Sequence, residues 1–162
     1  MKLKYWAALI GMILSILCVF AVDITTFKYR VGRGISGNGN PGLIALALSW
    51  TFFTVTLTLL AFIFVDFLKR KSNKLIQLAV ATLSATLLIS MVFAELRAIN
   101  ILEKNLNGFS SDRDSVVFRF TLINQYTNTL FYNWYILIFG IALALFISCL
   151  IVLYGNRKNK NS

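Results

Sequence analysis

Side chains that could do chemistry are few in this chain, which contains six acidic residues, two cysteines and no histidine. Catalysis and metal binding usually need several such groups that converge on one point. Cys18 and Cys149 fall in two different apolar stretches, and Asp66 and Glu95 stand at the ends of two others. We therefore predict no catalytic residue, no metal ligand and no cofactor, and a protein that is not an enzyme.

One apolar stretch carries three hydroxyls, Thr51, Thr54 and Thr58, at the spacing of a single helix face. Such a stripe is compatible with a polar path for an ion, which makes a small channel or transporter subunit the alternative function. We favour a helix-packing role for the stripe. Threonine hydroxyls bond to carbonyl groups of their own helix, and small side chains let helices approach closely.

Apolar stretches dominate the chain, because 58% of its residues are hydrophobic and only 14% are charged. Four stretches lack Asp, Glu, Lys and Arg, and each approaches or exceeds the roughly 18 residues typical of a membrane-spanning helix. The predicted fold is an all-α membrane protein with one integral membrane domain, 1–162, built as a four-transmembrane-helix bundle. The predicted spans are about 5–22, 43–66, 75–94 and 130–154, with exterior segments 23–42 and 95–129.

The net charge of +10 comes from basic residues at the ends of the apolar stretches, which argues against nucleic acid as a partner. By the positive-inside rule, acid-free basic clusters stay in the cytoplasm, so both termini are predicted inside and both longer connections outside. The abundance of Lys, Asn, Ile and Phe favours the inner (cytoplasmic) membrane of a bacterium. The three acid-free clusters are Lys2 and Lys4; Lys69, Arg70, Lys71 and Lys74; and Arg157, Lys158 and Lys160.

The first 21 residues are also compatible with a cleaved secretory signal, because Lys2 and Lys4 precede an apolar run that ends in Val19-Phe20-Ala21. We favour an uncut membrane anchor, since the apolar run is long for the hydrophobic region of a signal.

Each predicted span carries a stripe of small side chains, and in lipid such stripes mark the places where helices approach one another. The same stripes are compatible with a homo-oligomer. The residues predicted at helix contacts are Gly11, Ser15, Thr51, Thr54, Thr58, Thr86, Gly140, Ala144 and Ser148.

The exterior segments contain two short alternating patterns, 26–31 and 116–122, that predict β-strands. Helical spacing continues from Glu95 through Leu106, and Gly108 is a natural stop, so the third span is expected to project outward. Two paired strands would form a small extracytoplasmic cap over this projection. Two mobile loops are the other interpretation of these segments.

Aromatic and basic residues gather in the first exterior segment, and such residues dominate protein-binding surfaces. We predict partner binding by Phe27, Lys28, Tyr29, Arg30 and Arg33, either to another membrane or membrane-inserting protein or to membrane lipids. In size, basic termini and four-span topology the chain resembles the immunity proteins of pore-forming colicins, and phage or plasmid exclusion proteins. The resemblance implies an immunity, exclusion or accessory-subunit role through protein contacts, and it assigns no site residue.

A reporter enzyme that is active only in the periplasm should work when fused after Asn38 or Asn107 and fail after Ser72 or Ser162. The reason is that the dense basic clusters are held in the cytoplasm. Reporter activity is measured for each fusion and divided by the amount of fusion protein. Activity at Ser72 would reverse the orientation.

Overall fold

The computed structural model describes residues 2–30, 39–70 and 73–158, and in this part of the chain all regular structure is helical. Four long helices follow one another, and the short 3-10 helix η1 (Asn128–Leu130) precedes the last of them. By length and composition all four long helices are able to cross a membrane. They are α1 (Lys2–Thr25), α2 (Gly42–Arg70), α3 (Lys74–Asn105) and α4 (Trp134–Lys158).

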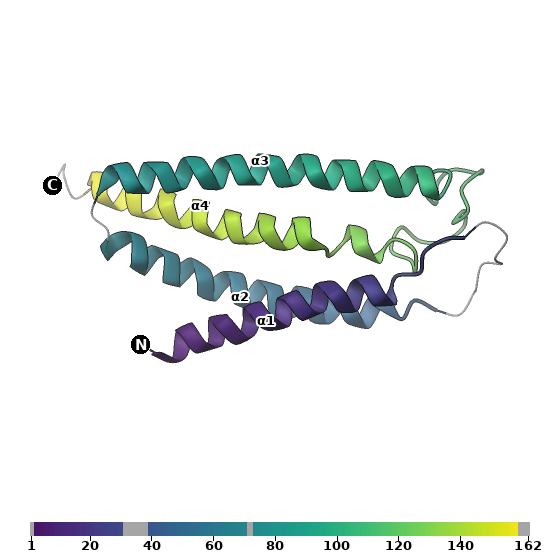
Figure 1. Ribbon diagram of the computed structural model, residues 1–162, viewed down its shortest axis with the longest axis horizontal. Helices are drawn as coiled ribbons and strands as arrows, with labels where there is room; N and C mark the ends of the chain where they lie inside the picture. Colours follow the sequence, from purple (N-terminus) through teal and green to yellow (C-terminus); the bar gives the residue numbers. More distant parts are fainter. Residues whose placement is uncertain (1, 31–38, 71–72, 159–162) are drawn as a thin grey trace.

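The four helices form a flat bundle in the spatial order α1, α2, α4, α3 (Figure 1). Each helix packs along its length on its neighbour in this row, and α1 touches α4 only slightly. The start of α1 and the end of α4 lie at the same end of the molecule, here called the termini end (Figure 1). The opposite end, here called the cap end, holds the end of α3 and the segment 106–133.

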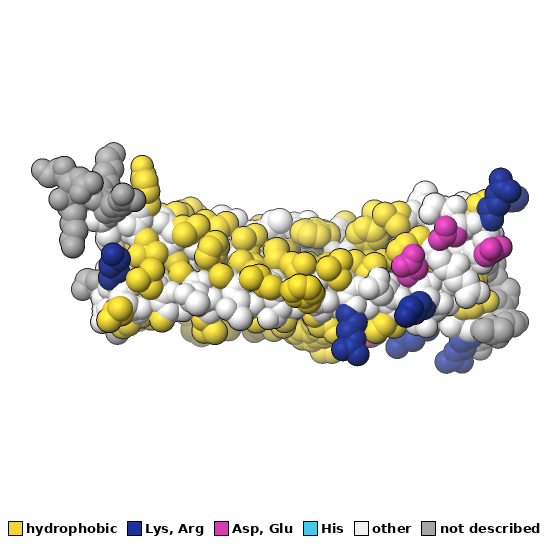
Figure 2. Space-filling view, turned by 90° about the horizontal axis from the view of Figure 1, so that it is seen from above, with side chains coloured by type: hydrophobic (Ala, Val, Ile, Leu, Met, Phe, Trp, Pro, Cys, Tyr) yellow, Lys and Arg dark blue, Asp and Glu magenta, His cyan; other side chains and the backbone are white. Residues whose placement is uncertain are grey.

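Apolar side chains fill the seams of this row and also cover its outside. Val22, Leu68 and Cys149 are fully buried, whereas Ile44 and Leu83 are largely exposed, at 72% and 69%. Figure 2 shows apolar side chains along the whole length of the molecule and charged ones toward its ends. This distribution fits a surface solvated by lipid chains rather than by water.

Two glycines let α2 approach both of its neighbours. A Cβ atom added to Gly11 of α1 would overlap the hydroxyl of Thr56, and one added to Gly140 of α4 would overlap the ring of Phe53. Ser15 is fully buried beside the same Thr56, with 3.5 Å between the two hydroxyl oxygens. Small residues therefore stand where backbones come closest, as expected where lipid gives no hydrophobic drive.

Further along α4, two more of the predicted packing residues are buried against α2. Ala144 is 7% exposed and Ser148 is fully buried. The Ser148 hydroxyl donates to the carbonyl oxygen of Ala61 in α2 at 3.1 Å, and also to Ala144 O at 2.7 Å. The α2–α4 seam thus combines close packing with one interhelical hydrogen bond.

The threonine stripe lies elsewhere than predicted. Thr51, Thr54, Thr58 and Thr86 are exposed on the outer faces of α2 and α3. Each hydroxyl donates to the carbonyl oxygen four residues earlier, at 2.8 to 3.0 Å, so it needs no partner from another helix. Thr56, which the stripe leaves out, is the threonine of α2 that faces α1.

The expected β-cap is not observed in the described residues. Residues 116–122 form successive turns, in which the amides of Phe118 and Phe120 donate to carbonyl oxygens three residues earlier. Residues 26–30 are irregular, and Val31, the last residue of the first expected strand, lies outside the described part. Backbone groups that form hydrogen bonds within local turns do not need to pair with a neighbouring strand. This is why the alternating pattern predicted a strand that does not form.

The extension of the third helix beyond its predicted span is confirmed, because α3 continues to Asn105. The amide of Gly108 donates to Glu103 O at 2.9 Å and that of Asn107 to Lys104 O at 3.3 Å. These two bonds are the Schellman arrangement that ends a helix. The left-handed residue is Asn107, with φ of 53°, and Gly108 follows it with φ of 100°.

Polar contacts also join the helices at the termini end. Lys4 of α1 forms an ion pair with Asp66 of α2. Gln77 of α3 is fully buried, and its amide nitrogen donates to Leu68 O of α2 at 3.2 Å while its oxygen accepts from Asn156 of α4 at 3.3 Å. A glutamine that bonds two other helices ties the edge helix α3 to the row.

Replacing Gly140 by alanine should lower the free energy of unfolding by about 1–3 kcal/mol, because the new methyl group overlaps Phe53. Gly155 in the same helix is the matched control, since a Cβ there meets no atom within 4 Å. Gly155→Ala should raise stability by up to ~1 kcal/mol through helix propensity. Denaturant unfolding in detergent compares the variants, and equal midpoints for Gly140→Ala and the parent would contradict the close contact.

Candidate functional site

A run of buried polar side chains closes the cap end. Residues 124–128, with the sequence Asn-Gln-Tyr-Thr-Asn, are each at most 8% exposed. Within the run, the Asn124 side chain accepts from the amide of Tyr126 at 2.9 Å, and the Thr127 hydroxyl accepts from the amide of Asn124 at 2.9 Å. These local bonds make the segment a rigid plug, and η1 at its end contacts α1, α2 and α3.

Asn128 connects the plug to the start of α2. Its side-chain amide and that of Asn40 donate to each other's oxygen, both at 2.8 Å, and Asn128 is fully buried. The same Asn40 oxygen accepts from the amide of Gly42, the first residue of α2, at 3.0 Å. A Cβ at Gly42 would overlap the Asn128 amide, so this glycine leaves the room that the pair occupies.

Tyr132 connects the segment before α4 to the middle of α1. Its ring is fully buried and packs edge-on against Phe53, with 5.5 Å between ring centroids. Its hydroxyl donates to the carbonyl oxygen of Ser15 at 3.1 Å. Trp50 completes the aromatic group, and this residue is 44% exposed.

Asn133 decides where the last helix begins. Its side-chain oxygen accepts from the amides of Tyr135 and Ile136 at 2.8 and 3.0 Å, which caps the amino end of α4. The predicted span started at residue 130, whereas the helix α4 begins at Trp134, directly after this cap. The Asn133 amide also donates to Glu95 of α3 at 2.7 Å.

The predicted partner-binding residues lie next to this plug. Phe27 is 53% exposed, Lys28 and Arg30 are exposed, and Tyr29 is half-buried against Leu106. The amide of Phe27 donates to Gln125 O at 2.7 Å, which fixes the segment on the plug. Arg33 lies outside the described residues. The structure thus brings Phe27, Lys28 and Arg30 to the surface and uses Tyr29 for packing.

A hollow of about 510 Å³ separates this segment from the end of α3. Its walls include Phe27 and Lys28 on one side, Leu102 and Asn105 of α3 on the other, and Tyr126 of the plug. A mixed apolar and polar hollow of this kind is the form of many recognition sites. It can hold a side chain or short loop of another molecule.

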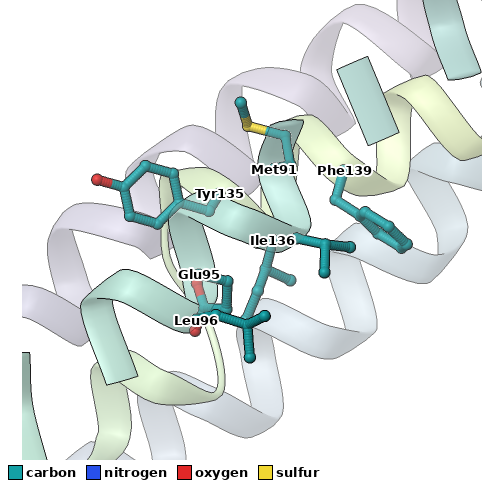
Figure 3. Close-up of a pocket in the computed structure, with 7 residues that line it drawn as sticks. Met91, Glu95, Leu96, Tyr135, Ile136 and Phe139 are labelled. Carbon is teal, nitrogen blue, oxygen red and sulfur yellow. The ribbon is translucent and has the colours of Figure 1, made fainter. Parts of the chain in front are cut away.

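A second hollow, of about 230 Å³, lies between α3 and α4 beside Glu95 (Figure 3). The sticks in Figure 3 show one acidic side chain among apolar ones that come from both helices. No set of three His, Cys, Asp or Glu side chains within the described residues is arranged to hold a metal ion.

Sequence reasoning missed the asparagines that hold the cap end together. Asn40, Asn128 and Asn133 bond to elements up to 88 residues away in the chain. The sequence feature that could have indicated them is the uncharged polar run of residues 124–129 between two apolar segments. Such a run resembles an ordinary loop in composition, and only its burial distinguishes it.

Replacing Asn40 or Asn128 by alanine should each lower the free energy of unfolding by about 1–3 kcal/mol, because the remaining amide loses its partner. The double variant should lose less free energy of unfolding than the two single variants together, since both changes break the same pair. Unfolding in detergent provides the four values of the cycle, with Asn100→Ala, an exposed position on α3, as the control. Additive losses would show that the two amides do not interact.

The chain matches no protein-family model, no curated protein and no solved structure.

Proposed function

We propose that this chain is a non-enzymatic membrane protein that acts by binding another protein at its cap end. The role would be of the immunity, exclusion or accessory-subunit type, in the inner membrane of a bacterium, with the protein encoded by the bacterium or by a phage. The observation that carries the proposal is the exposed group of Phe27, Lys28 and Arg30 beside the 510 Å³ hollow. An aromatic ring and cations next to a hollow are typical of binding hot spots.

The placement of charges supports binding on the outer side of the membrane. Lys2, Lys4, Lys69 and Arg70 lie on the ends of α1 and α2 that form the termini end. Asp66 also lies at this end, paired with Lys4, whereas the other five acids lie toward the cap end. By the positive-inside rule this distribution favours cytoplasmic termini and an outward cap.

The rigidity of the surface supports recognition rather than a mobile linker. The Phe27 amide is bonded to the buried plug, and Tyr29 packs with Leu106 and Val117 in a small core of the cap end. A backbone held in this way loses little conformational freedom when a partner binds, which favours affinity.

The alternative, a channel or transporter subunit, has less support. Thr51, Thr54 and Thr58 lie on the outside of the single chain with their hydroxyls bonded to their own helix. A path lined by this stripe would need several copies that turn these faces toward one another.

A photo-crosslinking amino acid at position 27 should give a discrete adduct with one protein in the membranes of the source cells. The same crosslinker at position 113, which is also exposed at the cap end, should not. Adding Lys28→Ala with Arg30→Ala should lower the adduct yield at least about tenfold, as expected for the loss of two hot-spot side chains. Mass spectrometry identifies the partner.

Lys104→Ala with Arg113→Ala is the matched control, because it removes two exposed cations from the same end. Neither pair should change the melting temperature appreciably, since exposed substitutions usually change stability by less than about 0.5 kcal/mol. An adduct yield that is equal in both double variants would contradict the proposed surface. Ion flux through proteoliposomes of the pure protein would favour the channel instead.

A further inference from the structure

A continuous groove runs between α1 and α3 at the cap end, where three hollows join. The hollow beside Phe27 shares Asp23 with a hollow of about 390 Å³ between the ends of α1 and α3. That hollow shares Ala98 and Tyr135 with a third, of about 660 Å³, along α3. Leu102 lines all three. The ends of α1 and α3 form the walls of the groove, and the start of α4 lies between them (Figure 1).

Two opposite charges face this groove, one from each wall. Asp23 of α1 and Arg97 of α3 are exposed and line it. Neither forms an ion pair with a described residue, whereas Lys4 and Asp66 pair at the termini end. Ala98, the residue after Arg97, lines the same hollow as Asp23. The two unpaired charges therefore stand at a similar depth in the membrane, on opposite walls.

An exposed aromatic ring precedes each of these charges by about one turn. Phe20 lies three residues before Asp23 and is 51% exposed, and Phe93 lies four residues before Arg97 and is 69% exposed. Both helices run from the termini end to the cap end. Each wall thus has the same order from the middle of the membrane outward, a ring and then a charge, and the two charges are opposite in sign.

Small side chains on α3 leave room for another helix in the groove. Ala94 and Ala98 line it and stand four residues apart, so they lie on one face of α3. Small residues at this spacing let helix backbones approach closely in lipid. A helix that fits this groove needs a small face, a ring and a cation at the depth of Asp23, and α3 itself has all three.

We propose that this groove is the interface of a homodimer, in which α3 of each copy lies in the groove of the other. Two copies with the same orientation in the membrane are related by a two-fold axis along the membrane normal, so every residue keeps its depth. Arg97 of each copy then meets Asp23 of the other, and Phe93 meets Phe20. The two-fold repeats both contacts, which gives two ion pairs and two aromatic contacts per dimer.

The dimer goes beyond the proposed binding of another protein, and it is measured on the purified chain without that protein. Its failure would leave capture of a partner by a crosslinker at position 27 to be decided by its own experiment. A chain that captures no partner would in turn still show the dimer.

Association of the full chain is measured by Förster resonance energy transfer between donor- and acceptor-labelled copies in lipid vesicles, with the label on a C-terminal tag. Dilution with lipid gives an apparent Kd. Asp23→Arg and Arg97→Asp each place like charges at both contacts of their own homodimer. Each variant alone should therefore have an apparent Kd at least about tenfold above that of the parent.

Mixing the two variants is the decisive measurement. In a dimer of one Asp23→Arg chain and one Arg97→Asp chain, both contacts again join opposite charges. The mixed pair should therefore associate with an apparent Kd within about threefold of that of the parent. A folding defect within either chain could not be repaired by mixing, so this rescue separates a contact between copies from a role inside one chain.

Lys104→Asp and Asp114→Arg are the matched controls, because they reverse exposed charges at the same end that line none of the three hollows. Both should associate as the parent does, alone and mixed. A parent chain that stays monomeric at the highest protein-to-lipid ratio would overturn the proposal. So would single variants at positions 23 and 97 that associate like the parent, or a mixture that associates no better than either variant alone.

Discussion

The close approach of α2 to its two neighbours is the contact on which the rest of the structure depends. Lipid supplies little hydrophobic drive between helices, so their association has to come from dense packing and interhelical hydrogen bonds. On one face of α2 Thr56 fills the space left by Gly11, and on another Phe53 fills the space left by Gly140. Because α2 occupies the position between α1 and α4, the four helices form a row, with α3 at the far edge.

The segment before α4 holds the cap end of this row together through hydrogen bonds to all four helices or their ends. Asn128 pairs with Asn40 ahead of α2, and Tyr132 donates to Ser15 in α1. Asn133 caps α4 and donates to Glu95 in α3. Such bonds are strong where water is scarce, and a network of this kind is costly to break at any one member. The cap end can therefore present a fixed surface although it contains little regular structure.

The exposed cations Lys28 and Arg30 of the cap end take no part in that network as described. Lys28 and Arg30 are exposed beside a hollow that another protein could fill. Oε1 of Glu95 is buried and receives no donor from the described residues. The interactions that build the cap end therefore do not use its exposed cations.

The number and apolar character of the helices were predictable from the sequence, because a long charge-free stretch satisfies its backbone in lipid only as a helix. The extension of α3 also followed from its spacing, and the cationic patch was visible as a cluster of residue types. The partner of each helix face was not predictable. Small residues recur on several faces of every apolar helix, and hydroxyls such as that of Thr54 satisfy themselves within the turn. The strand-like alternation of residues 116–122 was overruled by local turns. Burial of Asn128, the cap at Asn133 and the half-satisfied Glu95 were decided by tertiary structure alone, because a polar side chain acquires its role from partners that are distant in the chain.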